Sequence, residues 1–205
     1  MEKTSVHSTG RQQFAQVISE ISNPLFIALP TFLVIALTSS ADLLHAFLWW
    51  IIAVLGISVA PLLFIWQGVR KGRYTDHHVS KREQRFVPLV FGLSCMALSF
   101  VFLYMLGASP VLIATVVAVI VACWISLVVT RYWKISLHLV GMAGAVTVFI
   151  LLFGPRLFVL SPLVILVGWA RWQVRAHTLF QALAGTILAV IVTIAIFLLF
   201  RIQIW

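Results

Sequence analysis

The strongest constraint on this chain is a succession of long apolar runs, each bounded by charged residues, proline or glycine. A hydrocarbon core about 30 Å thick needs roughly 20 apolar residues per helix, and an open strand edge would leave backbone groups unpaired in lipid. Seven runs have this character: residues 24–41, 44–69, 86–107, 110–130, 136–154, 157–170 with a continuation to 175, and 178–200. We therefore predict an all-α fold, an integral membrane antiparallel helix bundle with six or seven transmembrane helices, because the first and sixth runs are the weakest.

The composition supports a membrane protein. Of the 205 residues, 62% are hydrophobic and 9% are charged, whereas an ordinary soluble domain has roughly 45–50% and about 25%. Residues 1–23 are predicted as a polar N-terminal segment, and not as a cleavable signal peptide, whose apolar stretch would lie closer to the start. Residues 24–205 are predicted as one transmembrane domain. Cys95 and Cys123 lie inside apolar runs and are expected to be small packing residues, with no disulfide framework and no metal site.

Basic residues are distributed unequally between the predicted connections. One face of the membrane carries essentially Arg156 alone, and the other carries Arg70, Lys71, Arg73, Lys81, Arg82, Arg85, Arg131, Lys134, Arg171 and Arg175. Because basic residues collect in cytoplasmic loops, the larger set is predicted to face the cytoplasm, together with Lys3 and Arg11. The predicted orientation is the same when the five basic residues best suited to bind an anion are not counted. We expect a multi-pass protein of the plasma membrane with a cytoplasmic N-terminus.

The net charge of +9, with histidine neutral, lies almost entirely on that predicted face. One explanation is topology together with attraction to anionic headgroups, which is worth about 1 kcal/mol per basic residue near the surface. Membrane lipids are therefore expected partners. Nucleic acid is not, because the chain has no soluble domain to present a groove-sized basic surface.

Three short segments on the same predicted face carry polar groups that lipid would not tolerate. They are "DHHVSKREQRFVP" at residues 76–88, "KISLHLVGMAG" at residues 134–144 and "RWQVRAHTLFQ" at residues 171–181. Ionisable groups at membrane depth are by default candidates for function. We therefore looked for a site that combines the three segments.

The third segment has a spacing that suits phosphate chemistry. On a helix that resumes near His177, Gln181 lies one turn further on the same face and within reach of the imidazole. Such a contact fixes which ring nitrogen carries the proton and leaves the other free to attack or to accept a proton. Arg171 precedes His177 by six residues, so a turn between them would bring its guanidinium to the same point, where it could bind phosphate oxygens.

The second segment supplies complementary groups. Ser136 and the backbone amides at 136–138 open a helix, whose N-terminus favours an anion, and His138 beside them is a candidate proton donor. Gly141 and Gly144 would allow another helix to pack closely, which is also an ordinary feature of membrane helices.

At this point the chain resembles the type 2 phosphatidic acid phosphatases, which share their core with vanadium haloperoxidases. That family carries the motifs K-x6-R-P, P-S-G-H and S-R-x5-H-x3-D. The third motif reads "ARWQVRAHTLFQ" here, so Arg171, His177 and Gln181 fall at matching positions, with glutamine in place of the aspartate. The second reads "ISLH", which keeps Ser136 and His138 without the proline and glycine.

The first motif of the family has only a partial counterpart. "SKREQRFVP" has the basic residues but not the spacing, and we assign Arg85 with Lys81 or Arg82. Lys134 and Asp76 are auxiliary candidates. Asp76 or Glu83 could also supply the carboxylate that position 181 lacks.

The resemblance implies a metal-independent hydrolysis of a prenyl or glycerolipid phosphate or diphosphate, with no cofactor. His177 would attack phosphorus to give a phosphohistidine, and His138 would protonate the leaving group. Arg171, Ser136 and the loop cations would bind the phosphate oxygens, and water would then release phosphate. Grooves between the helices would accept the lipid tail.

Two other functions stay open from the sequence. A catalytically degenerate relative would bind lipid phosphate or a membrane partner without turnover. A membrane prenyltransferase would use Asp76 and Glu83 to bind Mg²⁺ and diphosphate, although two carboxylates among six basic residues make a poor magnesium site.

Of the remaining polar residues, His77 and His78 are expected to be a solvated pair, and His45 beside Asp42 is expected to be an interfacial pair.

Overall fold

A computed structural model describes residues 10–77, 79 and 81–203, and the described residues form helices and no strands. The elements are α1 (Gly10–Ile21), α2 (Pro24–Ser39), α3 (Leu43–Val54), η1 (Leu55–Val59), α4 (Ala60–Arg70), η2 (Arg82–Gln84), α5 (Phe86–Met105), α6 (Pro110–Tyr132), α7 (Leu137–Phe153), η3 (Pro155–Leu160), α8 (Ser161–Gln173) and α9 (Leu179–Leu199). The predicted all-α fold is confirmed. Lys3 and His78 lie outside the described residues.

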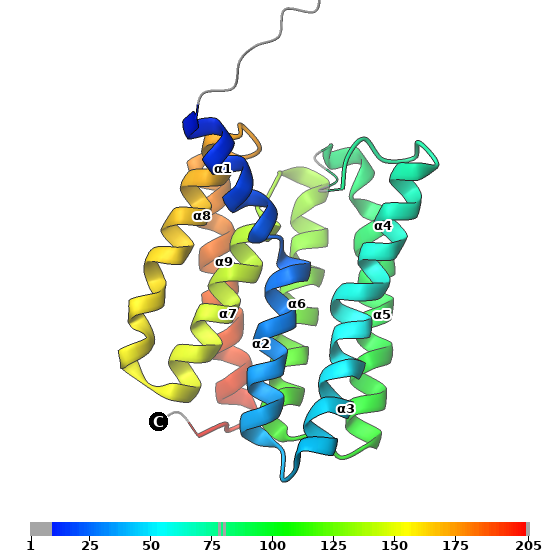
Figure 1. Cartoon of the computed structure of the whole chain (residues 1–205), viewed down its shortest axis with the longest axis vertical. Coiled ribbons are helices and arrows are strands. Elements are labelled where there is room, and N and C mark those ends of the chain that lie inside the picture. Colours follow the sequence, from blue (N-terminus) through cyan, green and yellow to red (C-terminus); the bar gives the residue numbers. More distant parts are fainter. Residues whose placement is uncertain (1–9, 78, 80, 204–205) are drawn as a thin grey trace, which may run out of the picture.

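The helices run alternately up and down between two ends of an antiparallel bundle (Figure 1). One end carries α1, the loop of residues 71–85, the segment 133–136 before α7 and the turn between α8 and α9. We call it the motif end, because the three segments singled out in the sequence all lie there. The opposite end carries the α2–α3, α5–α6 and α7–α8 connections and the C-terminal end of α9 (Figure 1).

The apolar helices have the dimensions of membrane spans. Within the described residues, five continuous helical stretches are long and apolar enough to cross a membrane, and α1 with α2 forms a sixth candidate that is bent by 50°. Helix α7 is apolar but shorter, with 17 residues. Because proline, glycine and charged residues end the apolar runs, the observed boundaries lie within a few residues of the predicted ones. The protein is a multi-pass helical membrane protein.

The long second span contains a π-helix, η1, between α3 and α4. Its Gly56 lies against α5, where a Cβ atom would come within 2.6 Å of the Cys95 carbonyl oxygen. The Ser99 hydroxyl donates a hydrogen bond to the Ile52 carbonyl at 2.8 Å, next to the wider turn. Pro61 is the second residue of α4. There its missing amide costs little, because the first turn of a helix has no intrahelical partner for that donor.

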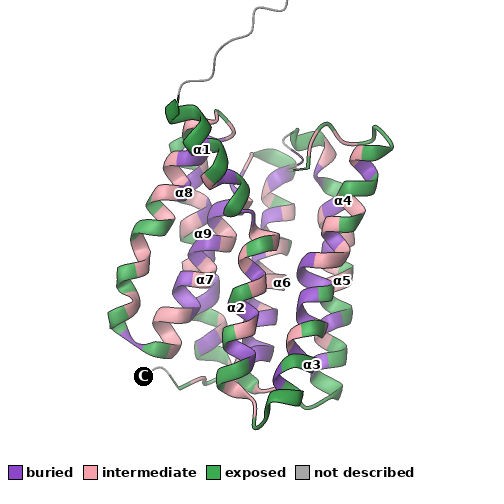
Figure 2. Cartoon of the chain, in the orientation of Figure 1, coloured by how far each residue is buried: buried purple, intermediate pink, exposed green. Residues whose placement is uncertain are grey.

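Burial follows the bundle geometry. The inward-facing sides of the central helices are buried, and exposed positions lie on the outside (Figure 2). Exposed residues on α9 include Leu183, Ile187 and Ile191, which are four residues apart and so form one apolar stripe. In a bilayer such a stripe contacts lipid tails, since exposed apolar surface is favourable there.

Helix α1 is the main difference from the predicted architecture, in which residues 1–23 are only a polar segment. It packs against α8, and the rings of Phe14 and Trp169 lie 6.1 Å apart. Ala15 and Ser19 are buried, whereas Val17 and Ile21 are exposed. The helix therefore presents one face to the motif end of the bundle and the other to its surroundings.

Candidate functional site

The motif end brings α7 and α9 into direct backbone contact. The Ser136 amide donates a hydrogen bond to the Gln181 carbonyl at 3.3 Å. One turn along α9, a Cβ atom on Gly185 would lie 2.7 Å from the Ser136 carbonyl oxygen, so only glycine allows this approach. Helix α7, which carries His138, and helix α9, which begins two residues after His177, are thus joined at the motif end.

The turn between α8 and α9 brings His177 back to Arg171, as the spacing predicts. The carbonyl of Arg171 accepts hydrogen bonds from the amides of Ala176 at 3.1 Å and His177 at 3.2 Å. Arg175 completes the turn in the left-handed region, with φ of 53°. Both Arg171 and His177 are buried.

Three basic side chains from different segments converge here, and we call Arg85, Lys134 and Arg171 the cation cluster. Arg85 is buried and donates from Nε to the Val79 carbonyl at 2.9 Å and from Nη1 to the Ile135 carbonyl at 3.1 Å. Lys134 Nζ donates to the Ala176 carbonyl at 2.7 Å. These bonds connect the 71–85 loop, the segment before α7 and the α8–α9 turn.

The cation cluster carries positive charge at close quarters. Partial burial lowers the pKa of Lys134, and the charges of Arg85 and Arg171 lower it further, while Asp76 and Glu83 act in the opposite direction. Groups of like charge destabilise one another unless an anion compensates them. The cluster is therefore a favourable place for a negatively charged group.

Two buried polar atoms beside the cluster lack hydrogen-bond partners in the described part of the chain. They are Arg171 Nε and Ser136 Oγ. An unsatisfied buried polar atom costs about 1–3 kcal/mol, so each one calls for a partner, either a water or a ligand. In the described residues Trp49, Ser58, Ser126 and Thr130 also carry such atoms, and the two at the cluster differ from these in lying beside positive charge. Both atoms can donate a hydrogen bond, which fits an anionic ligand.

His177 is oriented by Gln181, and the predicted contact is confirmed. The ring Nδ1 lies 3.2 Å from Gln181 Oε1, which also accepts the Thr178 amide at 3.2 Å. Since an amide oxygen only accepts, Nδ1 carries the proton and Nε2 keeps its lone pair. Burial lowers the pKa of His177 to about 3, and the positive charges of the cation cluster contribute further. The ring is therefore neutral at physiological pH.

Helix α1 contributes a residue that the sequence analysis missed. Arg171 Nη1 donates a hydrogen bond to the Ser19 hydroxyl oxygen, and His138 Nε2 lies 3.1 Å from the Ser19 carbonyl. Because a carbonyl accepts, His138 carries a proton on Nε2. The only sequence signal for Ser19 is its place four residues after Ala15 in a segment that mixes polar and apolar residues. This spacing predicts a buried face but not what that face contacts.

Other candidate residues lie outside the buried cluster. Lys81 and Arg82 are exposed, and Arg82 Nη1 donates to the Tyr132 carbonyl at 3.0 Å, which ties the loop to the end of α6. Asp76 accepts a hydrogen bond from the Thr75 hydroxyl at 3.2 Å. Gln181, and not a carboxylate from the loop, therefore contacts His177 Nδ1. His77 is exposed.

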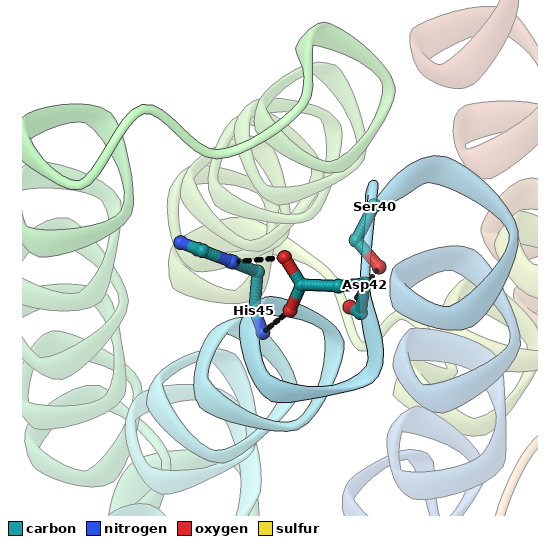
Figure 3. Close-up of polar contacts among 3 residues, drawn as sticks. All are labelled: Ser40, Asp42 and His45. Atoms are coloured by element: carbon teal, nitrogen blue, oxygen red, sulfur yellow. Dashed lines mark hydrogen bonds and ion pairs between the residues drawn. The ribbon is translucent and has the colours of Figure 1, made fainter.

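His45 and Asp42 form a local pair at the opposite end of the bundle (Figure 3). Asp42 caps α3 by accepting the His45 amide at 2.9 Å, and its other oxygen lies 2.6 Å from His45 Nδ1. Both side chains are half exposed. The pair is separate from the cation cluster.

Fold and site together define the class of this protein as a multi-pass helical membrane protein with a buried cationic site that contains two histidines. Comparisons with protein-family models, with curated proteins and with solved structures each find no match. In the described part of the chain, no three His, Cys, Asp or Glu side chains gather as a metal site requires.

Proposed function

We propose that this protein is a membrane-embedded lipid phosphate phosphatase, which hydrolyses a prenyl or glycerolipid phosphate or diphosphate through a phosphohistidine. The observation that supports this function best is the state of His177. It is a neutral imidazole whose Nδ1 proton is fixed by Gln181, and it lies among three cations. A nucleophile needs an available lone pair, and a phosphate needs positive charge and hydrogen-bond donors around it.

The donors of the site suit the oxygens of a phosphate. Arg171 Nε and Ser136 Oγ are buried donors without partners in the described part of the chain. The Ser19 hydroxyl and carbonyl now contact Arg171 and His138. Phosphate oxygens would replace these acceptors with stronger, charge-assisted hydrogen bonds.

In the first step, Nε2 of His177 attacks phosphorus and the bond to the leaving oxygen breaks. The leaving alcohol or phosphate takes a proton from Nε2 of His138, which enters the step as an imidazolium with both ring nitrogens protonated and becomes neutral. Charge on the equatorial oxygens is stabilised by Arg171 and Arg85, which is where preorganised donors contribute most to phosphoryl transfer.

In the second step, water attacks the phosphohistidine and its proton passes to His138. The bond between phosphorus and Nε2 breaks, inorganic phosphate leaves, and His177 returns to the neutral form with its proton on Nδ1. Gln181 holds the ring in one orientation through both steps. It adds no negative charge to offset the positive ring of the intermediate, which predicts a modest turnover number.

The distribution of charge supports a cytoplasmic site. The basic residues of the motif end outnumber Arg156 and Arg201 at the opposite end. By the bias of basic residues toward cytoplasmic loops, we propose that the motif end and the N-terminus face the cytoplasm.

A second candidate is a non-catalytic protein that binds lipid phosphate. The observation that favours it is the amide at Gln181, where the resembling family has an aspartate. Without a carboxylate, the positive ring of a phosphohistidine is less stabilised, and loss of an orienting carboxylate in a serine hydrolase costs about 10⁴-fold in rate.

The test is phosphate release by purified protein in detergent with EDTA. The panel contains prenyl phosphates, prenyl diphosphates, phosphatidic acid and phosphatidylglycerol phosphate. We expect release from wild type, loss in His177→Ala, and wild-type rates in His45→Ala, which removes an exposed histidine at the other end. A substrate labelled on phosphorus should leave an acid-labile, base-stable label on wild type only.

Absence of release from every substrate by folded protein would exclude the phosphatase. Tight binding of a lipid phosphate in the same samples would then support the second candidate. Release that persists in His177→Ala would place the chemistry elsewhere.

A further inference from the structure

An apolar cavity of about 170 Å³ lies inside the bundle, between α2, α5, α6, α7 and α9. At the motif end its walls include Pro24 of α2, Leu89 of α5 and Leu137 of α7. Leu137 directly precedes His138, and Leu89 follows Arg85 by one turn. The cavity therefore begins next to the candidate site, although the site residues themselves do not line it.

The depth of the cavity matches half a bilayer. Along α7 its lining extends from Leu137 to Val148, which is about 16 Å at 1.5 Å per residue. One leaflet of a hydrocarbon core is about 15 Å deep. A lipid with its phosphate at the motif end would place its tail over the same depth.

The walls are suited to hydrocarbon. Besides aliphatic side chains they include Thr31 and Thr115, whose hydroxyls donate to carbonyls of their own helices, at 2.7 Å to Ile27 and 2.8 Å to Val111. These hydroxyls are thus satisfied without water. A cavity of about 150 Å³ with apolar walls stays dry and accepts one benzene ring. By the same comparison of volumes, this cavity suits one hydrocarbon chain and not two.

We propose that this cavity binds a single hydrocarbon chain of the lipid phosphate, with the phosphate at His177. This rests on the proposed function, because it assigns the tail of the same substrate. One chain enters the cavity, and the length of that chain beyond the cavity volume, like the second chain of a two-chain lipid, stays outside. The cavity makes the protein selective for chain length and bulk.

The test uses Ala118→Leu, which adds bulk to the cavity wall from the middle of α6. The matched control is Ala97→Leu on the exposed side of α5. Phosphate release with EDTA is compared for dimethylallyl, geranyl, farnesyl and geranylgeranyl phosphate. We expect kcat/KM of Ala118→Leu for the longest chain to fall about tenfold, the effect of losing roughly two buried methylene groups. Dimethylallyl phosphate and the control variant should be unaffected.

An unchanged chain-length profile in Ala118→Leu, with release intact, would overturn the cavity assignment and leave the phosphatase standing. A second measurement works without turnover. An alkyl phosphate with a terminal diazirine is photolysed with wild-type protein, and the adducts are mapped by mass spectrometry. Adducts at Val119 or Cys123 would support the tail site even if no phosphate is released, and adducts confined to lipid-facing residues would overturn it.

Discussion

Two histidines of this protein each contact a neighbouring side chain through Nδ1, and their surroundings are opposite. His45 lies 2.6 Å from a carboxylate, Asp42, and both are half exposed. His177 lies 3.2 Å from an amide, Gln181, and is buried beside the cation cluster. The histidine with the charged partner, His45, is thus solvated by water. The histidine with the neutral partner, His177, is enclosed by the protein.

The difference has a physical reason. A carboxylate at position 181 would be drawn to Arg171 and Lys134 and would cancel part of their charge, since buried opposite charges attract strongly. A glutamine fixes the tautomer of His177 and leaves the positive charge available to an anion. Gln181 stands where the resembling family has an aspartate, and its contact with Nδ1 suits it to position the ring of His177.

The largest expected effect comes from removing the cations that distinguish the two histidines. Arg171→Met should lower kcat/KM for phosphate release about 10³-fold, because the guanidinium stabilises charge on the transferred group. Arg175→Met, an exposed arginine four residues away, should retain wild-type rates. Equal losses in the two variants would show that general positive charge, and not the cluster, is needed.

Removing the partner of each histidine should give the next largest difference. Gln181→Ala should lower kcat about 10²-fold, the effect of a reacting group misplaced by about 1 Å. Asp42→Ala should lower the Tm slightly as a lost helix cap, with no change in rate. Gln181 also caps α9 with Thr178, so Thr178→Ala controls for capping. A rate loss in Thr178→Ala as large as in Gln181→Ala would refute the positioning role.

Protein stability should respond to pH through His177. Its pKa is lowered to about 3 in the folded protein. Between about pH 3 and about pH 6.5 the unfolded chain therefore binds more protons than the folded protein does. The contribution of the neutral ring to the free energy of unfolding is complete only above that pH range. Between pH 7 and 5 the free energy of unfolding should fall by roughly 2 kcal/mol, seen as a lower Tm in detergent. His177→Gln should flatten this dependence and His77→Gln should not. An equal slope in wild type and His177→Gln would contradict the assignment.

The smallest expected effect comes from giving the buried histidine a charged partner. Gln181→Glu should raise the pKa of His177 by about one unit or more, because a carboxylate stabilises the imidazolium. The pKa is read from the ring resonances of isotope-labelled histidine in detergent, with His177→Gln used to assign the signal. A pKa equal to that of wild type would mean that the cation cluster, and not the partner, dominates the electrostatics of the ring.

Much of the fold was predictable because each end of a span has a local chemical cause. Proline begins α2 and α6, and basic residues mark the motif end. The π-helix was not predictable, since it depends on Gly56 meeting α5. Pro61 lies two residues after the π-helix, near the start of α4.

The site was predictable where its residues are close in the chain. The contact of His177 with Gln181 follows from helical spacing, and the approach of Arg171 follows from a short turn. Ser19 was not predictable, because it is more than a hundred residues from its partners and contributes a hydroxyl and a carbonyl that carry no motif. Spacing also could not distinguish Arg85, which is buried, from Lys81 and Arg82, which are exposed.

The close approach of α9 to Ser136 at Gly185 divides the site into a fixed part and an adjustable part. His138 stands on α7 and His177 lies two residues before α9, and these helices touch through backbone atoms. The spacing between the proposed acid and the proposed nucleophile is therefore set when the bundle folds. Ser19 and Arg85 come from α1 and from the loop before α5. We expect sequence changes in those two elements to alter which phosphate group the proposed site accepts without moving the two histidines.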